Sequence, residues 1–177
     1  LVWTTTPWTL VSNAALAVHP DLTYVEVRKK AGREWTLILA EPRATAVLGA
    51  GWEERWDVVG THVGRDLAGL RYHRPLDWVP YPEGAQHEVI VAESFVTAED
   101  GSGVVHMSPA FGADDYGAGQ RHNLAFIQPV DARGNFPEAM PLIGGKFFKD
   151  ADPIIIEELK RRDVLWKAAT VTHTYPF

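Results

Sequence analysis

Short runs in which hydrophobic and polar residues alternate dominate the chain, and this pattern predicts many short strands. The clearest run is Thr23–Lys29, which alternates with period two, and Glu34–Ala40 follows it across a turn that contains Gly32. Together these two runs predict a β-hairpin. Leu1–Thr6 and Ala14–His19 also have the composition of extended segments. Further strands are predicted at Trp56–Val59, Glu88–Ala92, Gly103–Met107, Ala125–Val130 and Ala169–Tyr175.

Helical signals are fewer. Glu41–Leu48 and Asp114–His122 each predict a short helix. The strongest signal is Pro153–Arg162, where Asp152 is suited to cap the helix and Pro153 suits the first helical position. Three apolar residues of this helix are expected to face the core: Ile155, Ile156 and Leu159.

Many short strands with a few helices predict an α+β fold, with a β-barrel-like core of mostly antiparallel strands and a few peripheral helices. The 15 glycines and 12 prolines suit the many turns of such a fold. A length of 177 residues fits a single domain, and 46% hydrophobic residues provide a real core. No apolar run approaches the roughly 18 residues of a membrane span, so we expect no membrane association.

Composition narrows the possible chemistry. The chain has no cysteine, which excludes disulfides, thiolate zinc sites and a cysteine nucleophile, and it fits the cytoplasmic location that we expect. The formal charge is −6, and the short basic clusters Arg28–Lys30 and Lys160–Arg162 read as solvated turns and a helix end rather than as a basic patch. If nucleic acid is the substrate, another part of the molecule must hold most of it.

The first segment whose side chains could take part in a reaction is Trp3–Thr9, followed closely by Asn13. Three adjacent threonines are ordinary in a strand, and composition alone favours that structural interpretation. In a regular strand Thr5 would face away from its two neighbours, so the three side chains would not line one pocket. Pro7 would end the pairing and leave hydroxyl and backbone groups free at the edge of a site.

The second segment is Glu99–Tyr116. It contains a Gly-Ser-Gly turn, a short apolar strand that carries His106, a break at Pro109 and a helix start at Asp114 and Asp115. The histidine and the second aspartate would converge if the loop folds back. The structural alternatives are a core histidine and aspartates that cap the helix. No metal-ligand spacing, phosphate-binding loop or nucleophile elbow is present.

These segments carry a resemblance to a known family. Trp3–Leu10 with Asn13 resembles the threonine-rich motif of the editing (CP1) domains of class I aminoacyl-tRNA synthetases. Gly101–His106 with Pro109–Tyr116 resembles the second editing motif, and the final His173–Phe177 resembles the segment that leads back to the catalytic domain. The Thr-Pro-Trp-Thr sequence and the histidine of the second motif are typical of the isoleucyl branch.

The resemblance covers nearly the whole chain, although residues 30 to 95 match little. Two departures occur: the usual Gly-Thr-Gly is Gly-Ser-Gly here, and Ser108 replaces the usual alanine, which adds a possible hydrogen bond. The nucleotide-binding signatures of the synthetases are absent. We therefore expect residues 1–177 to be one editing domain excised from a larger synthetase, with both ends at the junctions and no aminoacylation activity.

The resemblance implies post-transfer editing, in which the ester of valyl-tRNA made on isoleucine tRNA is hydrolysed. Asp115 would hold the ammonium group of the substrate. Thr5, Thr6 and Asn13 would position the carbonyl and the water. Thr6 and His106 would form the wall that excludes larger side chains. The resemblance implies that Trp8 and Tyr175 pack near the terminal adenosine or shape the pocket, and burial in the core is the structural alternative for both rings. The resemblance thus assigns catalytic positions to Thr5, Thr6 and Asp115, and substrate-binding positions to Thr4, Trp8, Asn13, His106, Asp115 and Tyr175.

No cofactor or metal is expected in this domain, because ATP and zinc, if used, would belong to other parts of the synthetase. The expected partners are the CCA end of isoleucine tRNA carrying valine and the rest of the synthetase chain, and we expect a monomer. Three alternatives stay open: a non-catalytic OB-like nucleic-acid-binding module, an unrelated esterase, and a free-standing deacylase. The first would need a basic, aromatic-lined groove.

Overall fold

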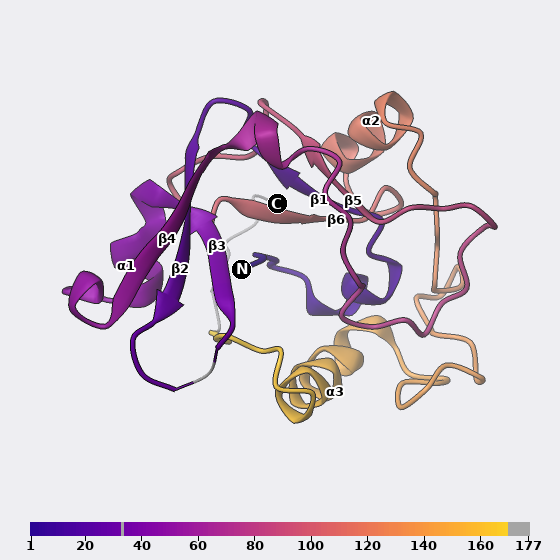
Figure 1. Cartoon of the computed structure of the whole chain (residues 1–177). Coiled ribbons are helices and arrows are strands. Elements are labelled where there is room, and N and C mark those ends of the chain that lie inside the picture. Colours follow the sequence, from indigo (N-terminus) through magenta and orange to yellow (C-terminus); the bar gives the residue numbers. More distant parts are fainter. Residues whose placement is uncertain (33, 170–177) are drawn as a thin grey trace, which may run out of the picture.

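The structure is a computed structural model, and it describes residues 1–32 and 34–169. Two three-stranded sheets form the framework of the described chain, one with strand order β5-β1-β6 and one with order β3-β2-β4 (Figure 1). The strands are β1 (Ala15–Val18), β2 (Thr23–Lys29), β3 (Thr36–Ala40), β4 (Trp56–Val63), β5 (Glu88–Val91) and β6 (Val104–Met107). The α-helices are α1 (Ala44–Leu48), α2 (Ala113–Arg121) and α3 (Phe148–Arg161). Short 3-10 helices are η1 (Pro7–Ser12), η2 (Glu41–Arg43), η3 (Trp52–Glu54) and η4 (Gly64–Leu67).

The predicted hairpin is confirmed. β2 has the predicted bounds and pairs antiparallel with β3 on one side and with β4 on the other. Its alternating pattern places Val25 and Val27 in the core, where they pack with Leu39, Trp52 and Trp56. Burial of one face of each strand against these aromatic rings is what holds this sheet together.

The second sheet is mixed. β1 runs parallel to β5 and antiparallel to β6, in a register that pairs Leu16 with His106. Small residues of β1, Ala15 and Ala17, are fully buried and allow Met107 to pack closely over this sheet. The central β1 therefore brings the histidine of the second motif next to the segment that follows the threonine run.

The α+β class is confirmed, but the described residues do not form a closed barrel, because the two sheets are not joined by a strand ladder. One contact between them is a backbone hydrogen bond of 2.8 Å from Ala40 N, at the end of β3, to Ser102 O, just before β6. The Gly-Ser-Gly turn makes this approach possible. Gly103 has a φ of +77°, and a side chain there would collide with Ala40.

Two predicted strands are wrong. Ala125–Val130 has no strand, helix or turn assignment. Within Leu1–Thr6 only Trp3 pairs, through an isolated parallel bridge to Val105, and Pro7 begins the 3-10 helix η1. Ile127 and Val130 pack against the core around Trp8, whereas Val2, Trp3 and Phe126 are exposed. Strand-like composition therefore does not by itself produce ladder pairing. The predicted strand Ala169–Tyr175 lies almost wholly outside the described residues.

The predicted helices α1 and α2 are present, whereas α3 begins earlier than expected, at Phe148, with Pro153 inside it. Asp152 is therefore not the cap of this helix. Its carboxylate instead accepts a hydrogen bond of 2.8 Å from Trp8 N, which ties α3 to η1. Ile155 and Leu159 face the core as predicted, while Ile156 is half-buried.

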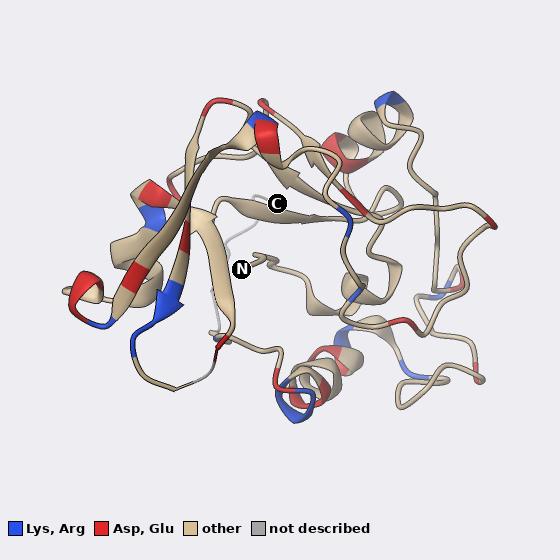
Figure 2. Cartoon of the chain, viewed as in Figure 1, with Lys and Arg blue, Asp and Glu red and all other residues tan. Residues whose placement is uncertain are grey.

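Charged side chains of both signs are scattered over the described elements rather than gathered on one side (Figure 2). The basic cluster at the end of α3 is partly neutralised, since Arg161 and Arg162 lie 2.7 and 2.8 Å from the buried Glu158 carboxylate. None of the described helices is long and apolar enough to span a membrane.

Candidate functional site

The threonine run is held against the edge of β6 by Trp3. Trp3 N donates to Val104 O at 2.8 Å, and His106 N donates to Trp3 O at 3.1 Å. A side chain at Gly101 would collide with the Trp3 ring, and Ser102 Oγ donates to Leu1 O at 2.8 Å. The Gly-Ser-Gly turn therefore fixes the backbone of the segment that leads into the threonines. The serine that stands in place of the usual threonine contributes to this through its hydroxyl.

The three threonines form a turn instead of a strand. Thr6 N donates to Thr4 Oγ1 at 3.1 Å, which closes a local turn. The hydroxyls of Thr5 and Thr6 lie 3.3 Å apart, so they gather on the same side of the chain, unlike side chains of successive strand residues. Thr5 is exposed and Thr6 is half-buried, so both hydroxyls remain near solvent.

The helix η1 connects this turn to the core. Thr9 Oγ1 donates to Thr6 O at 2.8 Å and lies 3.0 Å from His106 Nε2. Because Thr9 has one hydroxyl proton and gives it to Thr6 O, it must accept from the histidine. A buried threonine that sequence reasoning did not single out thus joins the two motifs.

The hydrogen-bond partners fix the tautomer of His106. Asn13 Nδ2 lies 2.8 Å from His106 Nδ1 and also donates to Ala15 O at 3.1 Å. An amide nitrogen is only a donor, so His106 Nδ1 accepts and the ring proton resides on Nε2, where it is donated to Thr9. The ring is 7% exposed, and both of its nitrogens are occupied. His106 is therefore not free to act as a general base.

Burial also keeps His106 neutral, because it lowers the pKa of the imidazole to about 4, and a hydrogen bond with the Thr9 backbone only partly offsets this. The neutral ring is the form that the two hydrogen bonds require.

Lowering the pH from 7 to 5 is expected to destabilise the fold through His106. The unfolded chain titrates this group near 6.5 and the folded chain near 4. The stabilisation is therefore complete above pH 6.5 and is lost as the pH falls toward 4, by about 2 kcal/mol at pH 5. Urea unfolding of the wild type and of His106→Gln at both pH values measures the difference. If both proteins lose equal stability, the buried neutral histidine is contradicted.

Asn13 is itself surrounded by partners from the segment between η4 and β5. The hydroxyl of Tyr72 donates to Asn13 Oδ1, and the hydroxyl of Tyr81 donates to Asn13 O at 2.7 Å. This segment lies within residues 30–95, where the motifs gave no information. A tyrosine without a neighbouring motif carries no sequence signal that assigns it to a site.

Asp115 lies in the first turn of α2, but its carboxylate does not cap this helix. Oδ1 accepts a hydrogen bond of 2.8 Å from Ser108 N, so the loop folds back as predicted. Gly112 allows this, because a side chain there would meet the Asp115 carboxylate. Burial raises the pKa of Asp115, only partly offset by its bond from Ser108 N. Among residues 1–32 and 34–169, no lysine, arginine or histidine forms a salt bridge with this carboxylate.

One continuous hydrogen-bond network links the two motifs. Ser12 Oγ donates to Thr9 O at 3.1 Å and lies 2.8 Å from Ser108 Oγ, whose backbone N–H binds Asp115. The serine that replaces the usual alanine thus forms the hydrogen bond that the sequence suggested. Thr9, Ser12 and Ser108 connect the threonine turn to the aspartate.

One of the predicted substrate-binding residues, Trp8, lies in the hydrophobic core instead of in this network. Trp8 is 8% exposed and its ring packs on Phe111 and Phe148, with centroid distances of 4.6 and 4.7 Å. That environment is a hydrophobic core, which leaves little ring surface for a ligand. Tyr175 lies outside the described residues.

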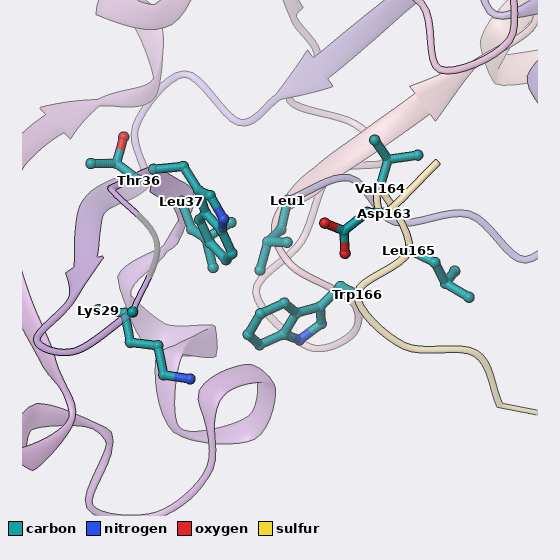
Figure 3. Close-up of a pocket in the computed structure, with 10 residues that line it drawn as sticks. Leu1, Lys29, Thr36, Leu37, Asp163, Val164, Leu165 and Trp166 are labelled. Atoms are coloured by element: carbon teal, nitrogen blue, oxygen red, sulfur yellow. The ribbon is translucent and has the colours of Figure 1, made fainter. Parts of the chain in front are cut away.

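Two cavities of the described chain lie away from this network. One of about 600 Å³ lies between the β2–β3 hairpin and the segment after α3, lined by Lys29, Trp35, Leu37, Asp163 and Trp166 among others (Figure 3). Among the described residues no group of three histidine or carboxylate side chains could hold a metal ion. The hydroxyls and the carboxylate of the network remain the better candidate for chemistry.

Comparisons with known proteins identify relatives of this chain. No family model matches the chain. By sequence, the chain is 47% identical over 176 residues to an isoleucine–tRNA ligase of Streptomyces avermitilis, a match that covers 99% of this chain and 16% of that ligase. The chain therefore spans only 16% of the length of this curated relative.

Two solved structures share the fold. The crystal structure of a leucyl-tRNA synthetase CP1 domain, GlLeuRS-CP1, is similar with a TM-score of 0.72 and 16% identity, over 98% of this chain and 82% of that one. The editing domain of the cytosolic leucyl-tRNA synthetase of P. knowlesi is similar with a TM-score of 0.63 and 12% identity, over 90% and 80% of the two chains.

Proposed function

This chain is a homologue of one segment of the isoleucine–tRNA ligases and belongs to that family, and we propose that it is an editing hydrolase. Its reaction would be cleavage of the ester that joins valine to the terminal ribose of isoleucine tRNA. The observation that carries the proposal is the series of hydrogen bonds that runs from the backbone oxygen of Thr6 through Thr9 and Ser12 to Ser108, whose N–H binds the half-buried Asp115 carboxylate. The solved relatives with this fold include a domain described as an editing domain.

The need for such a reaction is physical. Isoleucine and valine differ by one methylene, which contributes only about 1–3 kcal/mol of binding free energy in an apolar pocket. Binding in a single pocket therefore cannot separate the two amino acids well enough, and these ligases are the usual example of this limit. A second site that admits valine and excludes isoleucine by size removes the remaining error. We assign the excluding wall to Thr6 and His106, whose ring is held rigidly by Asn13 and Thr9.

Asp115 is suited to hold the substrate ammonium. Burial raises its pKa, which means that the folded protein stabilises its negative charge poorly. An ammonium ion from the aminoacyl group would supply the missing countercharge, through a charge-assisted hydrogen bond to Oδ2. The peptide N–H of Ser108 already binds Oδ1 and sets the orientation of the carboxylate.

The two threonine hydroxyls and the turn backbone would position the ester carbonyl and the attacking water. No protein group serves as a strong base in this scheme, because both nitrogens of His106 are engaged and its pKa is low. We assign activation of the water to the free hydroxyl of the terminal ribose. The protein then contributes orientation and exclusion of the larger amino acid.

The tRNA would be held mainly by the remainder of the ligase. A net charge of −6 and a scattered charge pattern do not favour strong independent binding of RNA (Figure 2). We expect the CCA end carrying valine to be the part of the tRNA that reaches this domain, and the domain to act as a monomer without a metal or cofactor.

Incubation with misacylated tRNA tests the proposal. The chain is expected to release valine from valyl-tRNA above the spontaneous rate, with saturation only at high tRNA concentration because binding is weak. Gel-shift measurements on the same samples serve as the comparison. Tight, salt-sensitive RNA binding without hydrolysis would contradict the proposal and favour the alternative of a non-catalytic OB-like module.

A further inference from the structure

The segment between η4 and β5, residues 68–87, directs two tyrosine hydroxyls onto one residue of the site. Tyr72 donates to the side-chain oxygen of Asn13, whereas Tyr81 donates to its backbone oxygen at 2.7 Å. Asn13 is 1% exposed, so these protein groups replace water as its partners. The segment has no helix or strand, and its course is therefore set by such tertiary contacts.

Both tyrosines are held from outside the site. The Arg74 guanidinium lies 4.4 Å from the centre of the Tyr81 ring and donates to Val79 O at 3.1 Å. The His87 ring packs edge-on against Tyr81 at 4.7 Å, and Tyr72 N donates to His87 O at 3.1 Å. Leu76 and Val79 anchor the same segment in the core around Trp8.

The hydrogen bonds from Tyr72 to the threonine turn all run in one direction. The tyrosine proton goes to Asn13 Oδ1, so the amide nitrogen faces Ala15 O and His106 Nδ1. The ring proton of His106 then points to Thr9, and the Thr9 proton points to Thr6 O. Reversing one bond would place two donors or two acceptors face to face, which is costly for buried groups.

We propose that Tyr72 is a positioning residue that sets the tautomer of His106 through Asn13 and thereby orients the wall and the threonine turn of the editing site. The effect of Tyr72 on hydrolysis rests on the proposed function. Its effect on the tautomer of His106 does not depend on that function. Burial raises the pKa of Tyr72, so the hydroxyl stays a donor over the working pH range of proteins. Tyr81, which binds only the backbone of Asn13, has no means of selecting the tautomer.

Nitrogen NMR of the chain labelled with ¹⁵N-histidine tests this directly, with variants Tyr72→Phe and Tyr81→Phe. In the wild type, His106 is expected to show a protonated Nε2 and an unprotonated Nδ1. In Tyr72→Phe the signals of the two ring nitrogens should move toward each other as the second tautomer becomes populated. In Tyr81→Phe they should stay as in the wild type, which makes it a matched control from the same segment.

A second control is Tyr24→Phe, which removes another buried hydroxyl that donates to Gly103 O at 2.6 Å. Thermal unfolding of all three variants corrects for loss of stability. Hydrolysis of valyl-tRNA is expected to fall about tenfold in Tyr72→Phe, the effect of one lost buried hydrogen bond, and less in both controls.

Unchanged ring signals in Tyr72→Phe would overturn the inference, and so would equal changes in Tyr72→Phe and Tyr81→Phe, because general loosening of the segment would then explain them. Failure of the wild-type chain to hydrolyse valyl-tRNA is a separate result. It would refute the proposed function, while the ring signals would still decide whether Tyr72 sets the tautomer.

Discussion

Replacing Asp115 with alanine is expected to reduce hydrolysis of valyl-tRNA by about a hundredfold or more. The substitution removes the proposed countercharge of the substrate ammonium, and removal of one partner of a desolvated charge pair costs about 2–5 kcal/mol. The loss should appear in the rate at saturating tRNA as well as in the apparent affinity, because the carboxylate orients the ester. Single-turnover deacylation with purified valyl-tRNA measures it.

Two variants separate charge from structure at this position. Asp114→Ala removes the adjacent, exposed carboxylate. It should leave the rate within about twofold of wild type, because the surrounding water and salt screen that charge. Asp115→Asn keeps an oxygen that can accept from Ser108 N but removes the charge. It should remain as stable as the wild type and lose hydrolysis. An active Asp115→Asn protein would show that the carboxylate only supports the loop.

The second large effect concerns the core. Trp8→Ala is expected to destabilise the protein by about 3–5 kcal/mol, because the ring fills the space between Phe111, Phe136 and Phe148. The backbone bond from Trp8 N to Asp152 survives the substitution, so the loss reports packing. Urea unfolding followed by circular dichroism gives the free energy of unfolding.

Trp166→Ala is the matched control, since that ring is 43% exposed and packs on Trp56 with a centroid distance of 6.0 Å. Its loss of stability should be less than half that of Trp8→Ala. Equal losses would contradict the core position of Trp8. They would revive the alternative that Trp8 stacks on the terminal adenosine.

The strands that the sequence predicted well are those whose pattern of burial is local. β2 alternates because one of its faces covers Trp52 and Trp56, and that period is readable without any knowledge of its neighbours. Leu1–Thr6 has equally strong strand composition, yet only Trp3 pairs with β6. Pro7 and the turn between Thr4 and Thr6 determine that segment, and both act through the backbone rather than through hydrophobicity.

The start of α3 could not be predicted for a different reason. Asp152 and Pro153 have the composition of a helix start, but the carboxylate is used for a tertiary contact with Trp8, which is distant in the sequence. The buried Phe148 side of the helix packs on the same tryptophan and favours the longer helix. A local signal was therefore overridden by long-range packing.

At the site, the two motifs gave the residues that carry distinctive chemistry but not those that join them. Thr9 lies in the first motif, but the motif assigned it no role, and Ser12 and Tyr72 are common residue types without a spacing rule. Only the fold brings these three residues to His106, Ser108 and Asn13. The same holds for the tautomer of His106, which depends on partners far away in the chain. Connecting residues of this kind become visible when donors and acceptors are counted in three dimensions.

The most direct test of the editing function is the ratio of two deacylation rates. The chain should be mixed in excess with isoleucine tRNA carrying either valine or isoleucine, and the first-order loss of each ester followed with the spontaneous rate subtracted. The proposed site predicts faster loss of valine by about tenfold or more, since an added methylene that clashes with a rigid wall costs at least about 1–3 kcal/mol. Equal rates for the two esters, or loss of isoleucine first, would contradict a site that selects the smaller amino acid.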